Sequence, residues 1–312
     1  MERARTWTEL LDRLYDGSWN AALQRHRSPY AFRGLADARH DLSNSLTRLA
    51  RGNPEATADG ASPTTAPVSD ITRLELSMLR NFRKYAVQQT AARADSIWHW
   101  LAVAQHHGLP TRLVDWTFSP LVALHFATEH PADYGRDGVV WCVDFVRAHQ
   151  RLPQRLRAVL DEEGSDTFTV EMLNDFPTLR DFDALSREPF LMFLEPPALD
   201  ARILNQAALF SLMPSPSASL HAWLEAHSAL SRQVIVPAEL KWEVRDKLDQ
   251  ANVSERMLFP GLDGLSRSLE RYYLPRTTAC TTSSHEDSEV NRHDVSRPGA
   301  RLRSVRLRQE RR

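Results

Sequence analysis

The longest apolar run in the chain is Gly138–Val143 (GVVWCV), and this segment places the strongest constraint on the fold. It falls far short of the roughly 18 residues that a membrane-spanning helix needs. Its length and its valines are typical of a strand, which we predict over 138–145. Apolar segments between turn-forming residues predict further strands at Phe190–Leu194, Leu209–Leu212 and Arg232–Pro237. A β-sheet is therefore expected at the centre of the protein.

Apolar residues at helical spacing predict several helices around that sheet. The first predicted helix covers Trp7–Tyr15, the second runs from Ile71 to Tyr85, and the third runs from Ile97 to Ala104, ahead of Gly108. The fourth is a short segment after Ser119-Pro120, and the fifth runs from Pro237 to Leu248. Proline fits the first turn of the fourth helix. The second and third of these stretches are two helices or one broken helix.

The stretch 52–69 is rich in Pro, Gly, Ala, Ser and Thr and has no periodic apolar face. It is therefore predicted to be a long, flexible surface loop. Asp70 could cap the helix that follows it. In that helix Leu74, Met78, Phe82 and Tyr85 form the predicted apolar stripe.

Charge and cysteine content exclude several classes of protein. The chain has 312 residues with Lys+Arg 39 and Asp+Glu 40, a formal net charge of −1, whereas a protein that coats nucleic acid has a large basic excess. Cys142 lies in the apolar strand and Cys280 in a polar segment, so we expect neither a disulfide framework nor a cysteine-based metal site. The N-terminus carries no apolar signal core, and we expect a soluble, cytoplasmic protein without a membrane partner.

The composition changes after Pro275. Residues 276–312 hold nine arginines and five carboxylates but hardly any large apolar side chains, which predicts a disordered tail. Its net charge of +4 leaves about −5 for the rest of the chain. Residues 297–312 could make a weak contact with a polyanion. We therefore expect a single α+β (or α/β) domain over 1–275, with a mixed or antiparallel central sheet, an N-terminal helical layer and a basic tail.

Residues suited to chemistry concentrate in two places, and the common phosphate-loop, hydrolase-elbow and zincin motifs are absent from the sequence. The first place is Phe32-Arg33-Gly34, where an arginine beside a glycine could hold a phosphate through its planar fork. The second is Gln105–Pro120 (QHHGLPTRLVDWTFSP), which packs hydrogen-bonding side chains between a glycine, two prolines and a tryptophan.

Several of these side chains also have a purely structural interpretation. Arg33 could pair with Asp115 at the edge of the core. Trp116 could be a core residue or could stack on a base or nicotinamide. Thr117 and Ser119 would face the same side of an extended chain and share a ligand, or would cap the helix from Pro120.

A metal site is a further alternative for this segment. His106 and His107 could bind a metal with Asp115, although adjacent histidines point in different directions in a regular backbone.

The sequence resembles the FRG domain family, named after its Phe/Tyr-Arg-Gly tripeptide. The resemblance covers roughly 20–270 and rests on Phe32-Arg33-Gly34, Leu42–Arg48, Gln105–Pro120 with Leu121–Ala127, Arg202–Phe210 and Leu258–Leu265. The Gln105–Pro120 segment is the most specific of these. Ala208 departs from the glycine that we expect in the family at that position.

A more distant similarity connects the chain to ADP-ribosyltransferases of the Arg-Ser-Glu type. Phe32-Arg33-Gly34 looks like their arginine strand, and Thr117-Phe118-Ser119 with Ala123–Ala127 looks like their Ser/Thr-x-Ser strand and Ala-x-x-Phe-Ala helix. The similarity implies that Arg33 holds a phosphate or ribose of NAD and that the two hydroxyls orient the nicotinamide ribose. A glutamate would then stabilise the oxocarbenium-like transition state.

The expected glutamate is missing from its plain position. Gln206 stands before the predicted strand Leu209–Leu212, and Glu195 or Asp115 could take the role of the carboxylate.

The resemblances together imply a protein that binds NAD, as ligand or substrate, in an ADP-ribosyltransferase-like pocket without a metal. The implied catalytic residues are Arg33, Ser119 and Gln206, and the implied ligand-binding residues are Phe32, Gly34, Gln105, His106, His107, Thr111, Arg112, Asp115, Trp116 and Thr117. Whether such a protein is an ADP-ribosyltransferase or an NAD glycohydrolase, and which protein it would modify, stays open. One alternative is a noncatalytic binding, sensor or effector module in bacterial stress or defence. The other is a metal-dependent hydrolase that uses His106, His107 and Asp115.

Overall fold

The computed structural model describes residues 2–52, 68–86 and 96–276, and the described residues up to Leu274 form one compact unit. Most of the predicted loop 52–69, the predicted disordered tail with its arginines, and Cys280 lie outside the described residues.

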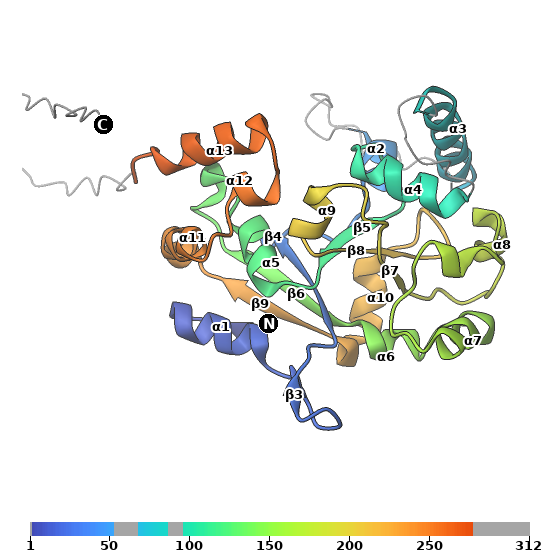
Figure 1. Ribbon diagram of the computed structural model, residues 1–312, viewed down its shortest axis with the longest axis horizontal. Helices are drawn as coiled ribbons and strands as arrows, with labels where there is room; N and C mark the ends of the chain where they lie inside the picture. The colour runs from blue at the N-terminus through green and yellow to red at the C-terminus, as the bar shows by residue number, and fades with distance from the viewer. Residues whose placement is uncertain (1, 53–67, 87–95, 277–312) are drawn as a thin grey trace, which may run out of the picture. The chain divides into compact units, whose positions relative to one another are not determined.

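One mixed sheet of seven strands runs through the protein in the order β1-β9-β6-β4-β5-β8-β7 (Figure 1). The strands are β1 (Glu2–Arg3), β4 (Tyr30–Leu35), β5 (Val114–Thr117), β6 (Gly138–Asp144), β7 (Met192–Leu194), β8 (Ala208–Leu212) and β9 (Ser231–Val236). All neighbours are antiparallel except β1 and β9, which are parallel. A separate hairpin joins β2 (Trp19–Asn20) and β3 (Arg25–His26). The α+β class, the mixed sheet and the strands predicted at β6, β7, β8 and β9 are confirmed.

Helices occupy most of the connections. They are α1 (Trp7–Tyr15), α2 (Ser45–Arg51), α3 (Val68–Ala86), α4 (Ile97–His106), α5 (Pro120–Ala127), α6 (Phe145–His149), α7 (Gln154–Glu163), α8 (Leu179–Asp183), α9 (Ala201–Asn205), α10 (Leu220–Ala226), α11 (Lys241–Gln250), α12 (Glu255–Leu258) and α13 (Leu262–Tyr272). Short 3-10 turns lie at Pro131–Asp133, Glu171–Leu173, Ser228–Leu230 and Ala238–Leu240. The helices predicted from sequence are confirmed as α1, α3, α4, α5 and α11.

Helix α3 differs from its prediction in two details. It begins at Val68, so Asp70 lies in its first turn instead of capping it. Its most buried positions are Ile71, Glu75 and Leu79, whereas Tyr85 is exposed. Of the predicted stripe, Phe82 packs against the core and Leu74 and Met78 are partly buried, while the charged Glu75 belongs to the most buried face.

Alternate residues of the central strands enter different cores, as the two-residue period of a strand requires. On one face Phe32, Val140 and Cys142 pack with α1, α5 and α11. On the other face Ala31 and Trp141 pack with α6 and α10. Cys142 is buried, as its apolar surroundings in the sequence predict.

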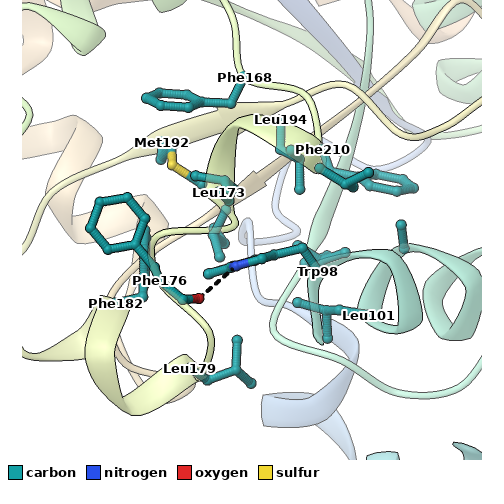
Figure 2. Close-up of a cluster of buried hydrophobic side chains, with 14 of the residues drawn as sticks. Trp98, Leu101, Phe168, Leu173, Phe176, Leu179, Phe182, Met192, Leu194 and Phe210 are labelled. Carbon is teal, nitrogen blue, oxygen red and sulfur yellow. Dashed lines mark hydrogen bonds between the residues drawn. The ribbon is translucent and has the colours of Figure 1, made fainter. Parts of the chain in front are cut away.

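A third cluster of buried side chains lies between α4 and the segment that leads to β7 (Figure 2). Trp98 of α4 is fully buried there, and its indole N–H donates to the backbone oxygen of Phe176 at 2.9 Å. This contact anchors α4, whose C-terminal end begins the Gln105–Pro120 segment.

Candidate functional site

A cavity of about 860 Å³ opens where β4 and β5 cease to pair. The two strands share one paired position, Phe32 with Thr117, whereas β4 pairs with β6 from Tyr30 to Leu35. The volume lies in the range of small-molecule sites. The cavity wall is formed by β4, the end of α4, β5, the end of α5 with the turn after it, α9 and β8; its residues are Phe32, Arg33, Gly34, Leu35, Ala36, His40, Ser45, Gln105, His106, His107, Gly108, Leu109, Asp115, Trp116, Thr117, Phe126, Glu129, His130, Asp133, Arg202, Ile203, Gln206, Ala208 and Phe210.

The Phe32-Arg33-Gly34 tripeptide combines packing with exposure to the cavity. Phe32 is buried against α1 and α5. Gly34 lies so close to α5 that a Cβ there would stand 1.8 Å from the backbone oxygen of Ala123. Because α5 packs directly on the strand, β4 is held firmly where Arg33 meets the cavity.

The side chain of Arg33 on β4 reaches across to β5, beyond the single position at which the two strands pair. Its Nη1 donates to the backbone oxygen of Asp115, and the Asp115 carboxylate lies 4.0 Å from the same nitrogen. Its Nε is buried and has no acceptor among the described residues. Burial lowers the pKa of Arg33, and the charge of Asp115 only partly opposes that shift. The cation is therefore incompletely neutralised by the protein.

The side chains of Gln105 and Asp115 form one hydrogen-bonded chain along the wall. Thr111 donates its hydroxyl hydrogen to Gln105 Oε1 at 2.6 Å, and Gln105 Nε2 donates to Asp115 Oδ1 at 2.8 Å. Thr111 itself is buried outside the wall. Its role is to fix the orientation of the Gln105 amide, which in turn positions the carboxylate.

His106 and Arg202 join α4 to α9 at another part of the wall. His106 Nε2 lies 2.8 Å from Asp200 Oδ2, and Arg202 Nη1 donates to the backbone oxygen of His106 at 3.4 Å. Arg202 Nε, like that of Arg33, is buried and without an acceptor among the described residues. Two arginines with incompletely satisfied guanidinium groups therefore line the same cavity.

The geometry does not favour the metal-site alternative. The His106 side chain is paired with Asp200, whereas Asp115 is held by Gln105. Over the described ranges, no group of three or more His, Cys, Asp or Glu side chains is arranged to hold a metal ion. His106 and His107 meet each other edge to face, with ring centroids 5.1 Å apart.

Arg112 lies outside the cavity wall and belongs to a buried ion pair. Its guanidinium donates to both carboxylate oxygens of Glu75, at 2.8 and 2.6 Å, and to Asp183 at 2.5 Å. These hydrogen bonds raise its pKa against the opposing effect of burial. Arg112 therefore ties α3 and α8 to the start of β5.

The two hydroxyls that were expected to share a ligand serve the backbone instead. Ser119 lies outside the wall and caps α5, accepting from the Val122 N–H at 3.4 Å. Thr117 lines the cavity, but its hydroxyl donates to the backbone oxygen of Gln206 at 2.7 Å and accepts from the Ser119 N–H. Ser119 is therefore the helix cap that the structural interpretation of this segment predicted.

Trp116 lies in the core and also borders the cavity. It is 4% exposed, packs edge to face on Phe193 and donates its indole hydrogen to Ser211 Oγ at 2.8 Å. Part of it nevertheless reaches the cavity wall. Its indole hydrogen bond points into the core.

Gln206 ends α9 and reaches the wall with its side-chain amide hydrogen-bonded. Its Nε2 donates to the backbone oxygen of Leu258 at 3.1 Å, and Ala207, which follows it, has a φ of +44°. Of the two carboxylates considered as substitutes, Asp115 lines the cavity, whereas Glu195 accepts from the Thr167 hydroxyl outside it.

Several wall residues had no signal in the sequence. Glu129 and Asp133 reach the cavity from the turn after α5, and Glu129 lies 3.9 Å from Arg267. Arg202, by contrast, could have been found, because it lies in the same segment as Gln206. Nothing in local spacing predicts that α9 packs beside the end of α4.

A family model described as FRG domain matches residues 28–136, which contain the tripeptide and the whole Gln105–Pro120 segment. Comparisons with curated proteins and with solved structures find no match. Within the described residues, no helix combines the length and the apolar character needed to cross a bilayer.

Proposed function

We propose that the cavity of this protein, whose residues 28–136 match the FRG domain family, binds a dinucleotide of the NAD type, with a phosphate held by Arg33. The observation that carries the proposal is the state of that arginine. The Nε of Arg33 is buried without an acceptor among the described residues, and its Nη1 donates to a backbone oxygen, with the Asp115 carboxylate only at 4.0 Å. Such an arginine favours an anionic ligand, since an incompletely compensated charge away from water is costly.

A second cation supports a ligand with more than one anionic group. Arg202 lines the same cavity, makes one long hydrogen bond to the His106 backbone and stacks on Phe259 at 5.1 Å. Two arginines on one cavity wall are suited to a diphosphate. The volume of about 860 Å³ can accommodate a dinucleotide.

Gln206 favours slow turnover over fast catalysis. If it occupies the position of the transferase glutamate, its neutral amide gives less support to a developing oxocarbenium ion than a carboxylate would. Its amide is also occupied by the Leu258 carbonyl. The same observation favours the second candidate, a noncatalytic binding module that retains the pocket.

Calorimetric titration of the protein with NAD, ADP-ribose and nicotinamide tests the proposal. We expect NAD and ADP-ribose to bind, because both carry the diphosphate, and nicotinamide alone to bind far more weakly. Saturable binding of nicotinamide with no binding of either diphosphate would overturn the proposal. Free nicotinamide, measured by chromatography after incubation with NAD, distinguishes a slow enzyme from a binding module.

A further inference from the structure

His106, on the wall of the cavity, forms a histidine–carboxylate pair with Asp200, which is not one of the lining residues. The His106 side chain is 8% exposed, and its Nε2 lies 2.8 Å from Asp200 Oδ2. Asp200 is fixed by a second set of contacts, since its Oδ1 accepts from the backbone N–H groups of Arg202 and Ile203 at 2.9 and 3.2 Å. Those backbone hydrogen bonds and His106 keep the pKa of Asp200 below its usual value, although burial acts in the opposite direction. The carboxylate is therefore ionised, and three hydrogen bonds hold it in this orientation.

The carboxylate determines which nitrogen of His106 carries the proton. An ionised carboxylate only accepts hydrogen bonds, so Nε2 of the neutral ring must be the donor. The lone pair of the neutral imidazole then lies on Nδ1. None of the hydrogen bonds found among the described residues involves that atom. The hydrogen bond from Nε2 to Asp200 therefore fixes the tautomer of the His106 ring and leaves Nδ1 as the basic nitrogen. A carboxylate prepares a histidine for proton abstraction in the same way in other enzymes.

We propose that His106, positioned by Asp200, is the general base for hydrolysis of NAD in this cavity, an inference that rests on the proposed binding of NAD. Water attacks C1′ of the nicotinamide ribose, and a new C–O bond forms. The C1′–N bond breaks, and both of its electrons stay with nicotinamide. The proton lost by the water passes to Nδ1 of His106 and later to solvent. The products are ADP-ribose, nicotinamide and one proton, so no reactant other than water is needed.

The charged and titratable neighbours of His106 agree with that role. Asp200 approaches from α9, Arg202 donates to the His106 backbone from the same helix, and the ring of His107 packs edge to face on it. The carboxylate can stabilise the imidazolium that forms during the reaction.

A purely structural role is the competing explanation, because the same contact ties α4 to α9. The variant Asp200→Asn separates the two. Asparagine is an equally good helix cap, so the backbone hydrogen bonds of α9 are kept. Its amide would donate to Nε2, which moves the ring proton to Nδ1 and abolishes the base. Asp200→Asn therefore keeps the contact between α4 and α9 but removes the ability of His106 to take a proton.

The experiment measures NAD binding by calorimetry and nicotinamide release by chromatography for wild type, Asp200→Asn and His106→Gln. We expect both variants to bind NAD within about threefold of wild type and to release nicotinamide at least 100-fold more slowly, in the range typical of general base catalysis. Added imidazole should restore part of the rate of His106→Ala.

A second histidine–carboxylate pair provides the matched control. On α10, His221 Nε2 lies 3.4 Å from Glu225 Oε1, and neither residue lines the cavity. His221→Gln and Glu225→Gln should release nicotinamide as wild type does.

The outcomes separate this inference from the proposed function. Absence of NAD binding by wild type overturns both. If wild type binds NAD without releasing nicotinamide, or if Asp200→Asn and His106→Gln release it at the wild-type rate, the assignment of the base is wrong while the binding proposal stands.

Discussion

Gly34 of β4 lies directly against Ala123 of α5, and a Cβ on Gly34 would stand 1.8 Å from the Ala123 backbone oxygen and 2.7 Å from the Ala127 nitrogen. Such distances are far below van der Waals contact, and both partners are backbone atoms that cannot rotate away. The glycine of the tripeptide is therefore explained by helix packing, independently of any ligand.

Gly34→Ala should destabilise the fold. The added methyl group forces α5 off the sheet, and overpacking of this kind costs about 1 to 3 kcal/mol, or more where backbone must move. Denaturant titration of the variant measures the loss. Gly135→Ala is the matched control, since a Cβ there meets no heavy atom within 4 Å. A Gly34→Ala variant as stable as wild type would contradict the close packing of α5 on β4.

His149 makes the stability of the fold depend on pH. Its ring nitrogens contact the Asp166 backbone oxygen and the Phe193 backbone N–H, each at 2.8 Å, and the second contact requires an unprotonated Nε2. Burial lowers its pKa from 6.5 to about 4. Between these values the unfolded chain binds a proton that the folded protein excludes. The stabilisation that the folded protein gains from the neutral His149 is therefore complete above pH 6.5 and is lost as the pH falls towards 4.

At pH 5 this loss amounts to about 2 kcal/mol, because one unit of pKa shift corresponds to about 1.4 kcal/mol. His149→Gln removes the titrating ring and should reduce the difference in free energy of unfolding between pH 7 and pH 5 by that amount. Denaturant titrations at the two pH values measure it. An unchanged difference would show that His149 does not titrate with folding.

Gln206→Glu should raise nicotinamide release. A carboxylate in this position supports the developing cation better than the amide does. The change also removes the donor to the Leu258 oxygen, so a loss of stability of about 1 to 3 kcal/mol should accompany it. Chromatography and thermal denaturation measure the two effects. Glu195→Gln is the control, because Glu195 lies outside the cavity wall. If this control abolished release, the role of the missing carboxylate would belong to Glu195.

The sequence predicted those parts of the fold that depend on local pattern. The strand at β6 and helices α1 and α4 follow from periodicity, and Pro120 marks the first turn of α5. The short helices α6, α8 and α9 have five residues each, too few for a periodic stripe to be recognised. Their positions depend on capping and on tertiary packing.

The candidate site was predictable where one segment carries many of its residues. Arg33, Gln105 and Asp115 were expected together and line the cavity together. Arg112 was placed in the site because it lies between site residues in the sequence, yet its guanidinium turns to Glu75 and Asp183 in the interior. Glu75 lies in a different helix, so no local pattern could reveal the pair.

The central claim is that Arg33 holds a phosphate of the ligand, and calorimetric titration of Arg33→Lys with NAD tests it most directly. Lysine keeps the charge but loses the planar fork, so binding should weaken by about 1 to 3 kcal/mol, roughly a 5- to 150-fold rise in Kd. Arg151→Lys, at an exposed arginine outside the wall, should bind as wild type does. Thermal denaturation should show that the Arg33→Lys fold is intact. Equal affinity of wild type and Arg33→Lys for NAD, or a variant that unfolds instead of losing affinity, would contradict the account.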